Sequence, residues 1–275
     1  MGQARKRLIQ LKRDHPHCCF CGGTRPTETA DHQPAAIIFP DKQRPKGLEF
    51  PACERCNGQT KADEALLALV SRMSGSLRQN ARFDPIRVSG LISTVEQAYP
   101  GLAARMLGPR LKRQQGDQVV IAGTFDVTDP QIDISFRTLA AKFALALFLH
   151  HTSAPAPIGT RIQTHWEHSH EGDVFGAVES FIALFPMHTD LRQGRWQTDE
   201  SFFIRYAYGE GLLFTAAIFH ESIALMARLV EPGAATAIDL DELVMGPSPK
   251  FGIAILDPIG VAKQILPVPH RQSLV

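Results

Sequence analysis

Near its N-terminus the chain reads Cys18-Cys19-Phe20-Cys21, then Asp31-His32-Gln33-Pro34, Cys53-Glu54-Arg55-Cys56-Asn57 and Lys61. It contains two Cys-x-x-Cys pairs, and four thiolates at Zn–S distances of about 2.3 Å form a closed, structural zinc site. We therefore predict that Cys18, Cys21, Cys53 and Cys56 bind one Zn²⁺ ion. We expect Cys19 to be a small, half-buried residue that does not bind the ion. The alternative is that Cys19 is the ligand in place of Cys18.

The polar residues beside these cysteines are not needed to hold zinc. Asp31 and His32 are adjacent, and Asn57 directly follows the last cysteine. An imidazole with a pKa of about 6.5 can act as a general base near neutral pH. Carboxylate and amide oxygens suit Mg²⁺ or Mn²⁺ better than zinc. These residue types indicate a site that cleaves phosphodiester bonds with the help of a second, catalytic cation.

In this pattern the stretch resembles the HNH endonucleases of the ββα-metal (His-Me finger) group, in the branch with four zinc-binding cysteines. The resemblance covers residues 18 to about 65. It implies that Asp31 and His32 end one strand of a hairpin and that Asn57 lies at the start of a helix. His32 would be the general base, and Asp31 and Asn57 would bind the catalytic Mg²⁺ or Mn²⁺. Lys61 occupies the position where the family has its last histidine. It would either contact a phosphate or have no role in the site.

The function that this resemblance implies is a metal-dependent endonuclease. His32 would activate water for attack on a DNA phosphodiester, which nicks or cleaves the strand. The resemblance to this family favours a role in bacterial phage defence. A zinc-dependent module that binds nucleic acid or assembles with proteins without catalysis is the alternative, and a nuclease directed at RNA is a third reading.

The charge of the chain is unevenly distributed. Residues 1–61 hold 11 Lys and Arg against 6 Asp and Glu, a net charge of +5, while residues 62–275 hold 18 against 22, a net charge of −4. Positive charge gathered beside the predicted site would neutralise phosphates, although a solvated face is the plainer reading. The candidate nucleic-acid-binding residues are Arg5, Lys6, Arg7, Lys12, Arg13, Lys42, Arg44 and Lys46.

The composition is that of a globular protein, with 44% apolar and 21% charged residues. No run approaches the roughly 18 apolar residues of a membrane span, so we expect no membrane association. Residues 1–13 lack the apolar core of a signal peptide. Because thiolates that bind zinc must stay reduced, we expect a cytoplasmic location.

We predict an α+β protein with three parts. Residues 1–75 form a zinc-stapled ββα-metal domain, 76–116 a helical connector, and 117–275 a mixed α+β domain with an antiparallel sheet. The last part would serve targeting or regulation, or contact protein partners or a second copy of the chain. The helices are expected at 3–14, 54–73, 132–150 and 173–185, and the strands at 119–127, 161–166, 202–208, 212–219 and 223–230.

One other cluster has ligand chemistry. It consists of His165, Glu167, His168, His170, Glu171 and Asp173. Alternate residues of a strand point the same way, so His168 and His170 would share a metal if the strand continues. A polar surface loop explains the cluster as well.

Overall fold

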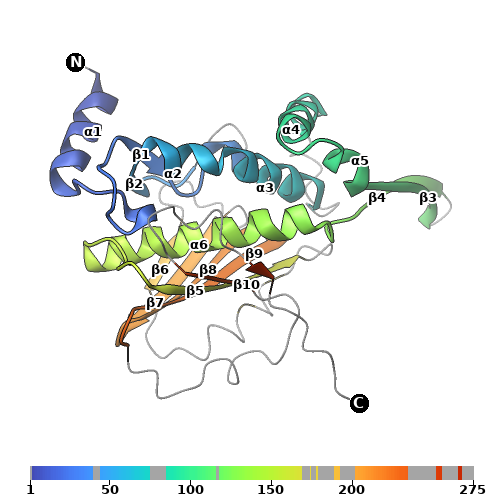
Figure 1. Cartoon of the computed structure of the whole chain (residues 1–275). Helices are drawn as coiled ribbons and strands as arrows, with labels where there is room; N and C mark the ends of the chain where they lie inside the picture. Colours follow the sequence, from blue (N-terminus) through green and yellow to red (C-terminus); the bar gives the residue numbers. More distant parts are fainter. Residues whose placement is uncertain are drawn as a thin grey trace, which may run out of the picture.

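The computed structural model describes most of the chain (Figure 1). The described residues are 2–39, 44–74, 85–115, 118–168, 174, 178, 189–192, 202–234, 252–255 and 266–267. For 109–115, 118–124, 189–192, 252–255 and 266–267 the backbone alone is described.

The N-terminal elements are short and follow the expected order. They are the helix α1 (Gln3–Asp14), the 3-10 turns η1 (Cys19–Cys21) and η2 (Ala36–Ile38), the strands β1 (Thr29–His32) and β2 (Glu49–Ala52), and the helices α2 (Glu54–Gln59) and α3 (Lys61–Ser74). The two strands pair antiparallel, with Asp31 opposite Phe50 and His32 opposite Glu49. The helix predicted at 54–73 is divided at Thr60. The strand-strand-helix order agrees with the predicted ββα-metal domain, which stays a prediction.

The first cysteine pair is followed directly by a glycine whose backbone conformation and surroundings leave no room for a side chain. Gly22 ends η1 in the left-handed region, at a φ of 60°, which costs glycine less than any other residue. A Cβ atom at this position would also collide with the side chain of Ile158. The turn that carries Cys21 therefore lies directly against the loop that follows the long C-terminal helix.

The connector is helical only in its first part. It contains α4 (Pro85–Ala98) and α5 (Leu102–Met106), followed by β3 (Leu107–Gln115), which pairs antiparallel with β4 (Gln118–Phe125). The prediction of helix up to residue 116 is wrong for 107–115. Pro109 disfavours a helix here, because proline lacks an N–H group and biases the preceding residue toward extended backbone. The two strands extend away from the rest of the chain (Figure 1).

The C-terminal part consists of one long helix and a large sheet. The elements are α6 (Pro130–Thr152), β5 (Arg161–His168), β6 (Thr189–Arg192), β7 (Phe202–Gly209), β8 (Leu212–Phe219), β9 (Ile223–Val230), β10 (Gly252–Ile255) and β11 (Leu266–Pro267). In the sheet the strand order is β11-β10-β5-β9-β8-β7-β6, and every neighbouring pair is antiparallel. The predicted α+β class with antiparallel sheets is confirmed. The helix predicted at 173–185 falls almost entirely outside the described residues.

Local signals explain the boundaries of these elements. Asp129 caps α6 by accepting a hydrogen bond from the backbone of Gln131, and Pro130 occupies the first turn, as expected at a helix start. The turn between β7 and β8 places Glu210 and Gly211 at positive φ, the conformation that suits a two-residue hairpin. Both elements lie close to their predicted positions.

The helix α6 lies between the N-terminal elements and the large sheet (Figure 1). It packs against α3 and η1 on one side and against β5, β8 and β9 on the other, and nearly all its residues from Ile132 to Leu149 are buried. A helix that is apolar all round is expected to be covered on all sides. No helix among the described residues is long and apolar enough to cross a bilayer.

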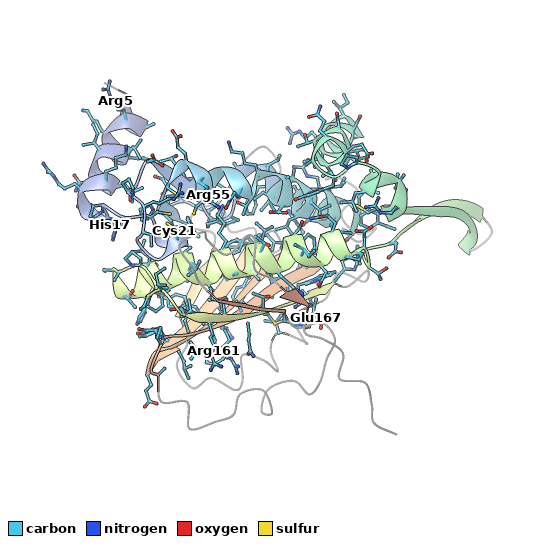
Figure 2. All side chains as sticks on the ribbon, in the orientation of Figure 1. Arg5, His17, Cys21, Arg55, Arg161 and Glu167 are labelled. Atoms are coloured by element: carbon cyan, nitrogen blue, oxygen red, sulfur yellow. The ribbon has the colours of Figure 1, made fainter. Side chains whose placement is uncertain are left out.

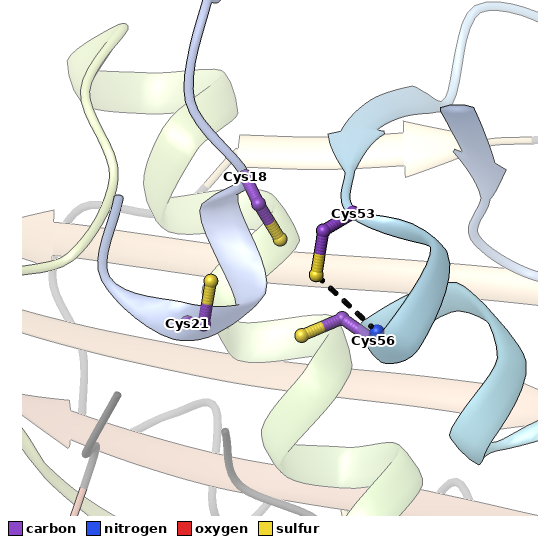
Figure 3. Close-up of side chains that lie close together, drawn as sticks. All are labelled: Cys18, Cys21, Cys53 and Cys56. Atoms are coloured by element: carbon purple, nitrogen blue, oxygen red, sulfur yellow. Dashed lines mark hydrogen bonds between the residues drawn. The ribbon is translucent and has the colours of Figure 1, made fainter. Parts of the chain in front are cut away.

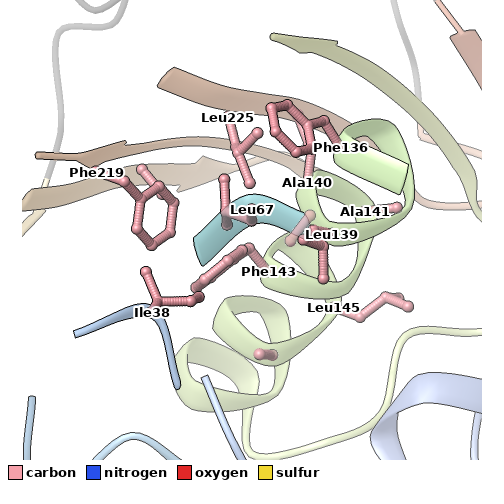
Figure 4. Packing of buried hydrophobic residues seen from close by; sticks show 14 of the residues in the cluster. Ile38, Leu67, Phe136, Leu139, Ala140, Ala141, Phe143, Leu145, Phe219 and Leu225 are labelled. Atoms are coloured by element: carbon pink, nitrogen blue, oxygen red, sulfur yellow. The ribbon is translucent and has the colours of Figure 1, made fainter. Parts of the chain in front are cut away.

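A single buried cluster joins the parts that the sequence divides into domains. Ile38 and Leu67 from the N-terminal elements, Phe143 from α6, and Phe219 and Leu225 from the sheet all belong to it (Figure 4). The domain boundaries stay a prediction, but the apolar residues on both sides of them share one core.

Candidate functional site

The four predicted zinc ligands come together in one place (Figure 3). The Sγ atoms of Cys18, Cys21, Cys53 and Cys56 all lie within 4.8 Å of one another, and all four residues are buried. Cys53 also caps α2, because its Sγ accepts a hydrogen bond from the backbone of Cys56 at 3.4 Å. The quartet is placed to hold a metal ion and is compatible with structural zinc. No other such group of ligands occurs among the described residues.

The thiols of the quartet are in mutual contact. Hydrogen bonds with Cys18 and Cys56 lower the pKa of Cys21, and the same contacts raise the pKa of Cys18 and Cys56. Cys19 does not belong to the quartet and is fully buried, not half-buried as predicted. Burial raises the pKa of its thiol well above the usual value. Cys19 therefore behaves as a small neutral core residue.

The carboxylate of Asp31 is enclosed at the end of β1. Only 3% of the residue is exposed. Its Oδ2 atom lies 2.7 Å from the Nζ atom of Lys142 on α6. Its Oδ1 atom accepts a hydrogen bond of 2.9 Å from the side-chain amide of Gln33. Both carboxylate oxygens thus have partners within the protein.

His32, the predicted general base, has a different environment. Strand alternation directs it away from the side of Asp31, and 38% of its side chain is exposed. Its Nδ1 atom lies 4.0 Å from Oε1 of Glu49, and that same oxygen lies 3.6 Å from Arg44 and 3.8 Å from Arg7. Burial, followed by the nearby Arg44 guanidinium, lowers the pKa of His32 below 6.5. The imidazole is therefore neutral at pH 7 and able to accept a proton.

Asn57 and Lys61 lie on the helices that follow the hairpin. The Nδ2 atom of Asn57 donates a hydrogen bond of 3.2 Å to Oγ1 of Thr29. Thr29 precedes Asp31 by two residues, so Asn57 and Asp31 lie on the same face of β1. Lys61 begins α3 and is exposed to solvent. The structure thus brings Asn57 to the Asp31 side of the strand and leaves the role of Lys61 a prediction.

The residues predicted to bind the catalytic cation do not fit an open site for it as they lie here. A Mg²⁺ or Mn²⁺ site in an enzyme keeps positions open to water or substrate. The Asp31 carboxylate is nearly inaccessible, and an ammonium group already neutralises it. The arrangement of these side chains therefore does not support the predicted binding of a catalytic Mg²⁺ or Mn²⁺ ion.

The basic residues predicted to contact nucleic acid lie on the surface around the hairpin. α1 packs against β1 and β2, and its basic side chains, including Arg5, extend into solvent (Figure 2). The exposed set on α1 is Arg5, Lys6, Arg7, Lys12 and Arg13. Lys46 is also exposed and Arg44 is partly buried. Lys42 falls outside the described residues.

The histidine cluster of the C-terminal part forms two separate contacts. The Nε2 atom of His165 lies 2.6 Å from Oε1 of Glu167. The Nε2 atom of His168 lies 2.6 Å from Oγ of Ser74, at the end of α3. The sharing of a metal by His168 and His170 stays a prediction because His170, like Glu171 and Asp173, falls outside the described residues.

Comparison of the chain with protein-family models, with curated proteins and with solved structures finds no match. The motifs and the geometry alone therefore define the site. It contains a buried four-cysteine cluster that is placed to hold a metal ion, and a two-stranded hairpin that carries a partly exposed histidine with a lowered pKa.

Proposed function

We propose that the chain is a zinc-stapled endonuclease of the HNH type that hydrolyses phosphodiester bonds in DNA. The observation that carries the proposal is the position of His32. Its imidazole is neutral and half-exposed at the end of a hairpin strand, with two arginines gathered around the neighbouring Glu49. Attack on a phosphodiester requires a proton acceptor and positive charge near the phosphate oxygens. His32 would supply the first, and the two arginines would supply the second.

The chemistry assigned to these residues is hydrolysis with a general base. His32 takes a proton from a water molecule as the water oxygen bonds to phosphorus in line with the leaving group. The bond from phosphorus to the 3′-oxygen breaks, and that oxygen takes a proton from solvent. Arg7 and Arg44 have planar guanidinium groups that match phosphate oxygens, and Glu49 holds both within 4 Å of one carboxylate oxygen.

The basic surface of α1 supports a nucleic-acid substrate. Its five basic side chains are exposed, and none of its residues is buried. Contacts between such side chains and phosphates release counterions, so affinity for DNA is expected to fall steeply as salt increases. In this proposal residues 117–275 serve targeting or regulation, and bacterial phage defence is the setting that the resemblance favours.

The test is nicking of supercoiled plasmid by the full-length, zinc-loaded protein. Base catalysis supplies about 10²–10⁴-fold in rate, so His32→Ala is expected to slow nicking by roughly this factor while keeping its zinc and its circular dichroism spectrum. His17→Ala is the matched control, because His17 is exposed and lies outside the hairpin. Equal nicking by the parent and His32→Ala would refute the assignment. Matched single-stranded and duplex RNA substrates distinguish DNA from RNA as the target.

A second function, a zinc-dependent nucleic-acid-binding module without catalysis, is favoured by one contact. The carboxylate that the resemblance assigns to the catalytic cation is paired with Lys142. This function predicts salt-sensitive DNA binding by the parent and by His32→Ala alike. It also predicts no nicking by either protein with Mg²⁺, Mn²⁺ or a chelator present, so the same plasmid assay separates the two functions.

A further inference from the structure

The ammonium group of Lys142 is surrounded by oxygens from three places in the N-terminal part of the chain. Its Nζ atom lies 2.7 Å from Oδ2 of Asp31 on β1. It lies 2.5 Å from Oγ1 of Thr60, between α2 and α3, and 3.3 Å from Oε1 of Glu64 on α3. The ammonium group donates hydrogen bonds to Thr60 and Glu64 and faces Asp31 as an ion-pair partner.

This oxygen set is largely enclosed, with the Glu64 side chain 12% exposed, and it holds two carboxyl groups against one ammonium group. Lys142 is 4% exposed, Asp31 3% and Thr60 3%. The ring of Phe20 lies 5.3 Å from the ammonium nitrogen and covers another side. Two carboxylates surround one lysine, and removing one member of such a buried pair leaves an uncompensated charge. The set therefore requires a cation.

We infer that Lys142 is a built-in cation, which takes the place between Asp31 and Glu64 that a divalent metal ion would otherwise occupy. Two carboxylate oxygens and a hydroxyl oxygen form a ligand set of the kind that Mg²⁺ and Mn²⁺ prefer. With the lysine in place this set is closed to both ions. Lys142 is thus a positioning residue that fixes Asp31 from the opposite part of the chain.

The ammonium group of Lys142 explains why the predicted site for a catalytic cation at Asp31 is closed. The resemblance leads one to expect a metal at Asp31, whereas this chain supplies the positive charge covalently, from α6. Any hydrolysis that depends on His32 would then proceed without a divalent ion at Asp31. The inference itself concerns metal binding and does not rest on nuclease activity.

The test is a Mn²⁺ titration of the zinc-loaded full-length protein, followed by electron paramagnetic resonance. Lys142→Met removes the charge and keeps the apolar stem, so it is expected to create a site for one Mn²⁺ per chain, bound at least about tenfold more tightly than by the parent. Adding Asp31→Asn to this variant is expected to remove the gained site. Lys6→Met, the same change at an exposed position of α1, is expected to leave Mn²⁺ binding as in the parent.

Two results would overturn the inference. The first is a folded Lys142→Met protein that binds Mn²⁺ no better than the parent. The second is a Mn²⁺ site in the parent that Asp31→Asn abolishes, because such a site would show that the lysine does not exclude the ion. The second comparison remains decisive if Lys142→Met fails to fold. Neither result depends on cleavage, so absence of nicking dependent on His32 would overturn only the proposed function.

Discussion

Removal of the metal from the four-cysteine centre is expected to unfold the N-terminal elements while the α6–sheet layer persists. Cys56→Ser removes one of four ligands, and a chelator removes the ion from the parent protein. The quartet ties η1 to the start of α2, so its loss frees the two segments that hold the hairpin in place. The contacts of α6 with β5, β8 and β9 do not involve any of these cysteines.

The size of the effect follows from comparing the metal with the packing that remains. Structural zinc contributes about 10–16 kcal/mol to folded zinc-finger peptides. Without the ion, the hairpin region keeps the burial of Phe20, Ile38, Phe39, Leu48 and Phe50, each at most 8% exposed. Burial of a large apolar side chain stabilises by about 1.5–3 kcal/mol, so the five together supply roughly 8–15 kcal/mol. That is comparable to the contribution of the metal, so the hairpin is expected to lose a large part of its stability with the ion.

Hydrogen exchange read by mass spectrometry tests this expectation. On metal loss, amides of β1, β2 and α2 should lose protection, while amides of β8 and β9 should keep it. Cys19→Ala is the matched control, because Cys19 is buried beside the quartet without belonging to it; this variant should keep one zinc per chain. Unchanged protection of β1 and β2 after complete, measured removal of the metal would refute the reasoning.

Three further outcomes are expected. Tyr99→Phe removes a hydrogen bond of 2.5 Å to the buried carboxylate of Asp63 and should lower the free energy of unfolding in urea by about 1–3 kcal/mol; an unchanged midpoint would contradict this. Phe143→Ala, at a position 3% exposed, should cost about 3–5 kcal/mol, seen as a lower thermal midpoint with the zinc content retained. Because burial and Arg44 lower the pKa of His32 below 6.5, the neutral base persists as pH falls, so the acidic limb of nicking should have its midpoint below pH 6.5. Arg44→Ala should move that midpoint upward, and a limb above pH 6.5 in the parent would argue against His32 as the base.

The features that could be predicted from the sequence are those with local signals. The two Cys-x-x-Cys pairs predict that four thiols meet in one place, and the structure brings them together where they could hold a metal ion. The capping residue Asp129 and the long apolar run after it locate α6. The aromatic and β-branched residues on both sides of Gly211 locate the β7–β8 hairpin.

The features that could not be predicted depend on contacts between distant segments. Lys142 and Asp31 are 111 positions apart in the sequence (142 − 31), and the only local sign is a lysine inside an apolar helical stretch. Nothing near Asp31 indicates that its carboxylate has a partner. The basic residues of β3 fit a helix surface as well as a strand, so Pro109 was the one local sign against a helix, and the strand is defined by its pairing with β4.

The position of Lys142 has a consequence for protein engineering. Because the lysine sits on α6, the hairpin and its cysteines do not form a portable cassette: a fragment ending before residue 130 would carry Asp31 and Glu64 without their counter-charge. Grafting the zinc-binding segment onto another scaffold would therefore require transplanting one turn of α6, or replacing both acids with neutral residues of similar size.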